Sequence, residues 1–210
     1  MQSRMVNGND VRIETLTGSA ILPLIPHLQR LRAAVFREWP YLYEGDPAVE
    51  SSPLRAFAES PRAAIVVALR GDEPVGASTC LPLADESANV RAPFEARGLD
   101  PARFFYFGES VLLPELRGQG VGVAFFRERE AHAGRVSRAD YACFCAVERP
   151  AHHPRRPPGA TGLAPFWTKR GYTHYPDLAC TMTWPEVGGT GPVQHRLSFW
   201  IKSLHGAPLP

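Results

Sequence analysis

The segment Phe104–Glu130 constrains the fold of this chain more than any other stretch. It opens with an apolar, aromatic-rich run that has the alternation of a β-strand, and this run is broken at Leu113-Pro114. Glycines then occupy alternate positions of Gly118–Gly122, and apolar residues return with helical spacing beyond them. The segment therefore predicts a strand, a turn and a helix in that order, and we call Gly118–Gly122 the glycine turn.

The glycine turn has the properties of an anion site. Because glycine lacks a Cβ atom, the backbone can approach a ligand closely, and its N–H groups can converge on an anion at the start of the helix. A dinucleotide-binding fingerprint would need a glycine at Val123 or Phe125, and a P-loop would need a lysine that the segment lacks. We therefore expect a phosphate group here, bound in neither of those two ways.

The segment resembles motif A of the GNAT acyltransferase superfamily, whose signature R/Q-x-x-G-x-G/A is matched by Arg117, Gly120 and Gly122. The resemblance implies a bulged strand whose backbone pairs with the pantetheine arm of acetyl-CoA, followed by a turn that holds the pyrophosphate. An ordinary strand–helix connection, with glycines for close packing, is the alternative. The cofactor-binding residues that the resemblance implies are Ser110, Val111, Leu112, Arg117, Gly118, Gln119, Gly120, Val121 and Gly122.

Length and composition favour a single domain over residues 1–210, with residues 1–10 as a flexible N-terminus. A chain of 210 residues that is 44% apolar can bury one core and is short for two. A net charge of +2, from 23 basic and 21 acidic residues, gives no basic field for nucleic acid or an anionic membrane. Since no apolar run reaches the roughly 20 residues of a membrane span, and residues 1–8 lack an apolar signal core, we expect a cytoplasmic protein.

The remaining segments predict an α/β (α+β) fold with a mixed, mostly antiparallel sheet of about seven strands flanked by helices. Apolar spacing predicts a helix that starts near Pro23 and Pro26 and runs through Phe36. The helix after the glycine turn should connect two parallel strands, which the GNAT resemblance implies are splayed. Besides the run from Phe104, the predicted strands are 11–16, 63–70, 75–83, 141–147, 178–184 and 193–204.

The other segments are expected to be loops and short helices. A short helix is predicted from Ser51 to about Glu59, and another within 162–172. Residues 84–102 are polar and broken by proline, so we expect a mobile loop with at most a short helix around 93–97. The proline-rich loop 148–162 is expected to be a stiff solvated connection, with a lid or a contact for a CoA phosphate as alternatives.

Cysteines and histidines do not form a metal-binding pattern. The alternate spacing of Cys143 and Cys145 places both side chains on one face of a strand, and no second pair stands at zinc-ligand distance. His152-His153 lies in a proline-rich loop without a partner at helical spacing. We expect buried free thiols and no metal site.

The loop after the first helix is dense in aromatic and acidic residues, and it predicts an acceptor site. Phenols and carboxylates on a bent loop suit a cationic or amine-bearing acceptor, and the resemblance places this loop beside the acceptor. Rings that plug the edge of the core are the alternative. The predicted acceptor-binding residues are Trp39, Tyr41, Tyr43 and Glu44.

Acetyl transfer to an amine needs a proton acceptor, because a free aliphatic amine has a pKa of ~10. The resemblance assigns this role to Glu109, directly or through water, and Tyr106 is a weaker candidate for proton handling. A structural pairing of Glu109 with a neighbouring loop is the alternative. Trp167 stands where the family often has the tyrosine that protonates the leaving thiolate, and an indole N–H cannot supply a proton near neutral pH.

The sequence thus predicts an acetyl-CoA-dependent N-acetyltransferase that acts on a primary amine of a small molecule by direct attack. No metal, nucleic acid or membrane is expected as a partner, and a homodimer is compatible with the sequence. Two alternatives stay open. One is acetylation of protein N-termini or lysines, and the other is a non-catalytic acyl-CoA-binding module.

Overall fold

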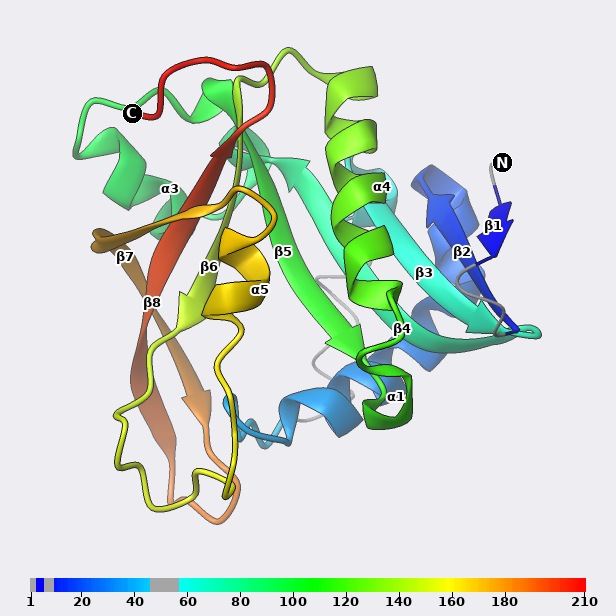
Figure 1. Cartoon of the computed structure of the whole chain (residues 1–210), viewed down its shortest axis with the longest axis vertical. Helices are drawn as coiled ribbons and strands as arrows, with labels where there is room; N and C mark the ends of the chain where they lie inside the picture. Colours follow the sequence, from blue (N-terminus) through cyan, green and yellow to red (C-terminus); the bar gives the residue numbers. More distant parts are fainter. Residues whose placement is uncertain (1–2, 6–9, 46–56) are drawn as a thin grey trace.

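The computed structural model describes residues 3–5, 10–45 and 57–210, which form one eight-stranded sheet with helices on both faces (Figure 1). The strands are β1 Ser3–Met5, β2 Val11–Leu16, β3 Ala64–Arg70, β4 Glu73–Pro82, β5 Phe104–Leu112, β6 Tyr141–Val147, β7 Thr173–Pro185 and β8 Pro192–Ser203. Their order across the sheet is β1-β2-β3-β4-β5-β6-β8-β7. Neighbouring strands are antiparallel except β5 and β6, which are parallel. The predicted mixed, mostly antiparallel sheet is confirmed.

Two layers of helices enclose the sheet. The helices are α1 Ile25–Phe36, α3 Ala88–Glu95, α4 Val121–Val136 and α5 Ala164–Thr168, with 3-10 turns η1 Gly18–Leu24, η2 Leu83–Asp85, η3 Pro101–Arg103 and η4 Pro114–Leu116. Helices α1 and α3 cover one face, and α4 and α5 cover the other (Figure 1). Among the described residues, no helix combines the length and the apolar character that a membrane crossing requires.

Strand β3 shows why the sheet needs both layers. Its run from Ala64 to Leu69 is buried throughout. Ile65 and Val67 pack with α1, whereas Val66 and Ala68 pack with α4 on the opposite face. A strand that is covered on both faces reads as a continuous apolar run rather than an alternating one, as this sequence does.

The central strands separate beyond their first residues. Among the described residues, β5 and β6 pair between Phe104–Tyr106 and Tyr141–Cys143, after which the two strands diverge (Figure 1). On its other side β5 carries a bulge, since Gly108 and Glu109 together lie opposite the single residue Thr79 of β4. Such a bulge bends a strand and increases its twist. The splay that the resemblance implied is therefore present, and it begins next to the bulge.

Glycine is required at the bulge by close contact. A Cβ atom added at Gly108 would lie 2.6 Å from Oγ1 of Thr79. That hydroxyl already accepts a hydrogen bond from the backbone N–H of Glu109 at 2.9 Å. The Gly-Glu pair thus fits a bulge whose second residue is fixed through its backbone.

Three parts of the chain differ from the sequence-based expectation. Ser3–Met5 pairs with β2 within the segment expected to be flexible, and this edge strand makes the sheet eight-stranded. Residues 84–102 contain helix α3, because Val90 and Phe94 are buried in the core around β5 and β8. Strand β7 begins well before residue 178 and passes through an irregularity between Tyr175 and Ala179. The helix predicted from Ser51 lies largely outside the described residues.

Candidate functional site

The glycine turn leads into α4 in a conformation that depends on glycine. Gly118 and Gly120 have φ angles of 76° and 87°, in the left-handed region that side chains with a Cβ atom rarely adopt. A Cβ atom at Gly122 would instead lie 3.2 Å from Cζ of Phe166 in α5. The first two glycines therefore shape the turn, and the third allows the two helices to pack closely.

The start of α4 offers backbone donors for an anion. The helix begins at Val121 with Gly120 as its N-cap residue. The first N–H groups of an α-helix have no acceptor within the helix, and the helix dipole places partial positive charge there. The backbone of the glycine turn can therefore bind a phosphate group without a basic side chain.

Two side chains of the turn hold it against its surroundings. Arg117 donates from Nε and Nη2 to the carbonyl oxygen of Leu112, each at 3.2 Å, and its Nη2 lies 2.8 Å from a carboxylate oxygen of Glu38. The Nε2 group of Gln119 donates to the carbonyl oxygen of Glu115 at 2.6 Å. Arg117 thus ties the turn to the end of β5 and to the residues that follow α1.

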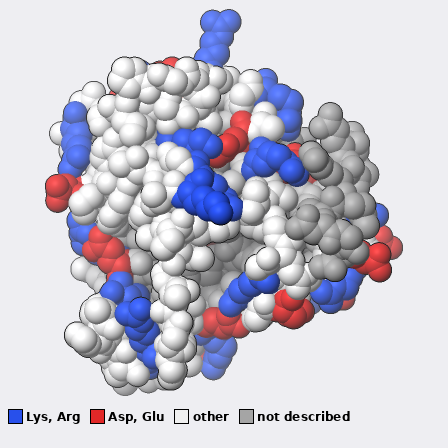
Figure 2. Space-filling model, in the orientation of Figure 1, with Lys and Arg blue, Asp and Glu red and all other residues white. Residues whose placement is uncertain are grey.

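A cationic side chain that the sequence reading did not single out lies beside this turn. The guanidinium of Arg170 stacks 3.4 Å from the ring centroid of Phe166, the residue that contacts Gly122, and donates to the Phe166 carbonyl at 2.6 Å. Its Nε atom is buried without a hydrogen-bond partner among the described residues. Burial lowers the pKa of Arg170. Figure 2 shows several basic side chains near the centre of the face that it draws.

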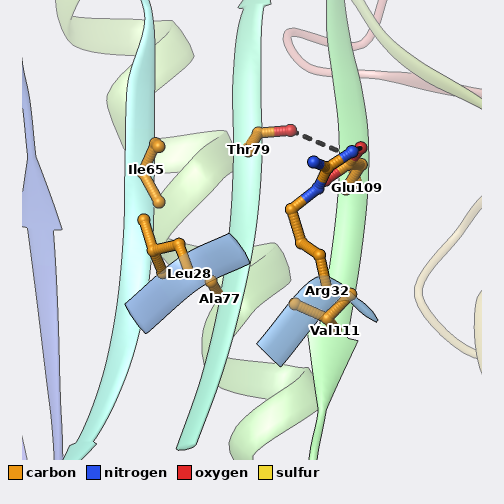
Figure 3. Close-up of a pocket in the computed structure, with 7 residues that line it drawn as sticks. All are labelled: Leu28, Arg32, Ile65, Ala77, Thr79, Glu109 and Val111. Atoms are coloured by element: carbon orange, nitrogen blue, oxygen red, sulfur yellow. Dashed lines mark hydrogen bonds and ion pairs between the residues drawn. The ribbon is translucent and has the colours of Figure 1, made fainter. Parts of the chain in front are cut away.

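Glu109 is brought into an ion pair with Arg32 of α1 (Figure 3). Arg32 donates from Nε to Oε2 and from Nη2 to Oε1 of Glu109, both at 2.6 Å. Arg32 is only 8% exposed, whereas the Glu109 side chain is 32% exposed. The carboxylate is therefore paired with helix α1 and not with a neighbouring loop, which was the alternative that the sequence left open, and the pair lies at the splay.

The pair lies over a small apolar cavity. This cavity has a volume of about 10 Å³, roughly the space of one water molecule, so it is too small for an amine substrate. Its apolar floor strengthens the attraction between the two charges above it, because the local dielectric is low. The lining residues are Leu28, Arg32, Ile65, Ala77, Thr79, Glu109 and Val111.

Tyr106 lies at the last position where β5 and β6 pair. Its hydroxyl is 3.2 Å from Sγ of Cys145, which is itself 4.0 Å from Sγ of Cys180. Burial raises the pKa of Tyr106 well above its ordinary value, and the neighbouring Cys145 raises it further. The phenol therefore stays neutral and is a weaker acid than an exposed tyrosine. All four cysteines are buried free thiols, as predicted.

The loop Trp39–Glu44, which we call the acceptor loop, places Tyr41 toward this site. The Tyr41 ring packs 4.9 Å from that of Phe36 and 5.9 Å from that of Trp184, measured between centroids. Burial raises the pKa of Tyr41, and the charges of Cys145 and Glu109 add to the effect. Tyr41 also packs against the core clusters that contain Tyr106 and Val111 of β5.

Trp39 and Glu44 make contacts away from Glu109, whereas Tyr43, like Tyr41, packs against the core clusters that contain Tyr106 and Val111. The Trp39 ring lies 5.1 Å from that of His153. Glu44 accepts hydrogen bonds from Arg37 at 3.0 Å and from the backbone N–H of Gly188 at 3.2 Å. Tyr43 forms an isolated β-bridge with Glu186. The structure therefore brings Tyr41, but not Trp39 or Glu44, toward the splayed strands.

The proline-rich loop 148–162 is fastened to the acceptor loop. Arg149 donates from Nε to the carbonyl of Pro40 at 2.6 Å and from Nη2 to that of Tyr41 at 2.8 Å. Its Nη1 group pairs with Glu186 at 2.5 Å, and Arg155 pairs with the same carboxylate. This loop is therefore more than a solvated connection, because it fixes the backbone that carries Tyr41.

Glu86 is a half-buried carboxyl group in the segment that the sequence predicted to be a mobile loop. It follows η2, and its Oε2 accepts a hydrogen bond from the backbone N–H of Ser87 at 2.6 Å. Burial raises the pKa of Glu86, the Ser87 hydrogen bond opposes this shift, and the charge of Glu109 adds to it. No pattern in the sequence marks this residue, because its burial depends on the packing of α3.

Trp167 belongs to the core between α5 and the sheet. Its ring lies 5.0 Å from the rings of both Phe144 and Trp200. Packing therefore accounts for this tryptophan. Within the part of the chain that the structure describes, no group of three His, Cys, Asp or Glu side chains could hold a metal ion.

Comparisons with known proteins give matches in structure alone. No protein-family model matches the sequence, and no curated protein is significantly similar to it. A GCN5-related N-acetyltransferase from Kribbella flavida is 17% identical with a TM-score of 0.52, over 92% of this chain and 98% of its own. An aminoglycoside 6'-N-acetyltransferase complexed with coenzyme A is 14% identical with a TM-score of 0.56, over 94% and 98%. A Salmonella typhimurium protein solved with its cofactor acetyl-CoA is 11% identical with a TM-score of 0.56, over 94% and 97%.

Proposed function

We propose that this chain, which has the fold of the GNAT acetyltransferases, is an acetyl-CoA-dependent N-acetyltransferase acting on a primary amine of a small molecule. The observation that carries the proposal is the combination of splayed strands, a bulge at Gly108-Glu109 and a glycine turn at the start of α4. In chain order, the proposed anion site would follow directly after a strand edge that has lost its partner. A long ligand with a phosphate at one end suits both features.

Acetyl-CoA would lie along β5 and end at the glycine turn. The backbone of Ser110–Leu112 faces the gap left by β6 and would pair with the amides of the pantetheine arm. The N–H groups of the glycine turn would hold the diphosphate, with the residues Arg117, Gln119 and Val121 keeping the turn in shape. Arg170 is a further candidate for a phosphate contact, because its Nε atom is buried without a partner beside the turn.

The reaction needs the amine nitrogen to attack the thioester carbon, after which the carbon–sulfur bond breaks. Glu109 would take the proton that the ammonium group loses, directly or through water. A backbone N–H of β5, for which we propose Leu112, would stabilise the developing oxyanion. The departing thiolate would take its proton from water, with Tyr106 as a weaker candidate because burial raises its pKa, and Trp167 cannot supply a proton.

The acceptor would enter between the acceptor loop and β5. Tyr41 is the wall residue that the packing supports best, and Trp39, Tyr43 and Glu44 would shape the rim. The test is to incubate the protein with acetyl-CoA and a panel of small primary amines and peptides, with detection of free CoA and of acetylated products by mass spectrometry. Acetylation of small amines supports the proposal, and acetylation of the peptides alone would replace it with a protein-directed activity.

A non-catalytic acyl-CoA-binding module is the second candidate, favoured by a tryptophan, packed against Phe144 and Trp200, where a tyrosine acid would stand. The acetylation assay, combined with the thermal midpoint measured with and without acetyl-CoA, separates the two functions. Thermal stabilisation by acetyl-CoA without release of CoA in the presence of any acceptor would favour the binding module.

A further inference from the structure

A charged residue interrupts the apolar face of α1. Leu28 and Leu31 are buried against the sheet, and Arg32, one turn after Leu28, is also buried. An arginine in this position loses hydration, which is tolerated only where an anionic or polar partner compensates for it. In the site, the buried guanidinium of Arg32 contacts the carboxylate of Glu109.

The contact between the two side chains has a geometry that only arginine can provide. The planar guanidinium presents Nε and Nη2 as a fork, and each group meets one oxygen of Glu109 at 2.6 Å. A lysine could reach the carboxylate as a single point charge but could not fix both oxygens. At its other end, Glu109 is held through its backbone N–H by Thr79.

The fork leaves part of the carboxylate available. An ionised carboxylate has about four acceptor sites, of which Arg32 uses two in the hydrogen bonds recorded here. The Glu109 side chain is 32% exposed, so water or an amine can reach it. The carboxylate is thus oriented without being sealed off.

We propose that Arg32 is a positioning residue for acetyl transfer, which holds the Glu109 carboxylate in one orientation beside the splayed strands. This inference rests on the proposed function, because it assumes that Glu109 handles the proton. Arg32 also lies over the ring of Phe36, with its Cζ atom 5.8 Å from the ring centroid. The effect of its removal on turnover should therefore be judged against the effect of removing Glu109.

The test is a double-mutant cycle with the amine that the wild-type protein acetylates fastest. Arg32→Gln, Glu109→Gln, the double variant and Arg32→Lys are compared by kcat, by KM for acetyl-CoA and by thermal midpoint. Arg30→Gln is the matched control, because Arg30 is exposed on the same helix and contacts His27. A crystal structure of Arg32→Gln adds a readout that does not depend on an acceptor.

We expect Arg32→Gln to lower kcat by roughly 10- to 100-fold with KM for acetyl-CoA within about twofold of wild type. The kcat of Arg32→Lys should lie between those of wild type and Arg32→Gln. Arg30→Gln should match wild type in kcat, and the double variant should be no slower than Glu109→Gln. In the crystal structure of Arg32→Gln, the Glu109 side chain should leave its present position.

Four results would overturn the inference. Wild-type turnover in Arg32→Gln beside an impaired Glu109→Gln would remove Arg32 alone and leave the proposed function intact. A double variant slowed by the product of both single effects would show that Arg32 acts independently of Glu109. An unmoved Glu109 carboxylate in the crystal structure would contradict positioning directly. Wild-type turnover in Glu109→Gln would remove the proposed role of Glu109 and the inference together.

Discussion

The two sides of the candidate site are built in different ways. The cofactor side consists of β5, the glycine turn and the start of α4, which follow one another in the chain. The acceptor side is assembled from segments far apart, since Arg32 reaches Glu109 across 77 residues and Trp184 donates to the carbonyl of Tyr41 across 143. One side is set mainly by backbone conformation, and the other by side-chain contacts between distant segments.

This difference predicts which changes each side tolerates. On the proposed cofactor side the ligand would meet N–H groups, so a substitution should matter there when it alters φ or blocks the approach of the backbone. On the proposed acceptor side the ligand would meet side chains held by ion pairs, so removal of one charge should disturb a residue elsewhere in the chain. The predictions below separate the two sides, beginning with the largest expected effect.

Glu109→Gln should give the largest loss of activity. General acid–base catalysis contributes about 10²- to 10⁴-fold to a rate, so kcat should fall by that factor while the Kd for acetyl-CoA stays within about twofold. Rates come from free-thiol detection and affinities from calorimetry. A matching fall in affinity would place Glu109 on the cofactor side and break the comparison.

Arg149→Met should loosen the acceptor loop. The change removes two hydrogen bonds to backbone carbonyls and one partner of Glu186, whose side chain is only 11% exposed. We expect a loss of about 2–4 kcal/mol in unfolding free energy and a higher KM for the acceptor, with the Kd for acetyl-CoA unchanged. Arg155→Met is the control, because the Arg155 side chain is 40% exposed and should cost less. Equal losses of unfolding free energy in the two variants would contradict the proposal that Arg149 fixes the acceptor loop.

Gly120→Ala should weaken acetyl-CoA binding and stability together. An alanine with the φ of 87° found at Gly120 costs about 1–2 kcal/mol, and relief of that strain would misdirect the N–H groups of the turn. Gly134→Ala is the control within the same helix, since an added Cβ atom there meets nothing within 4 Å. That control should stabilise the protein by about 0.4–1 kcal/mol and leave binding intact. Tight binding by Gly120→Ala would show that the turn does not hold the ligand.

Glu86→Gln should have the smallest effect, and it should depend on pH. The pKa of Glu86 is raised above its ordinary value of 4.5 by burial. Protonated Glu86 therefore contributes stability fully below pH 4.5, and this contribution is lost as the pH rises through the folded-state pKa. The stability of Glu86→Gln relative to wild type should increase between pH 4 and pH 8. Denaturant unfolding across that range checks the sign, and a decrease would refute it.

The cofactor side could be read from the sequence because its signals are local. Glycine at positions 118 and 120 indicated positive φ angles, which both residues have. The break at Leu113-Pro114 indicated where the strand ends and the turn begins. These features depend on neighbours within a few residues, so a single sequence records them. Ligand contacts of these residues remain predictions.

The acceptor side could be read only in part, because its partners are set by tertiary packing. A cation one turn after Leu28 on an apolar helix face marked Arg32 as unusual. No feature of the sequence identified Glu109 as its partner. Glu86 carried none, since the segment around Pro93 reads as a loop until Val90 and Phe94 are buried in the core. Side-chain partners across long separations follow from packing and not from local propensity.

Calorimetric titration of the wild-type protein with acetyl-CoA tests the central claim most directly, because every proposed role depends on binding at the glycine turn. The account predicts a saturable heat with one site per chain, and a clearly weaker affinity for Gly120→Ala under the same conditions. No heat from acetyl-CoA or CoA at high protein concentration would contradict it.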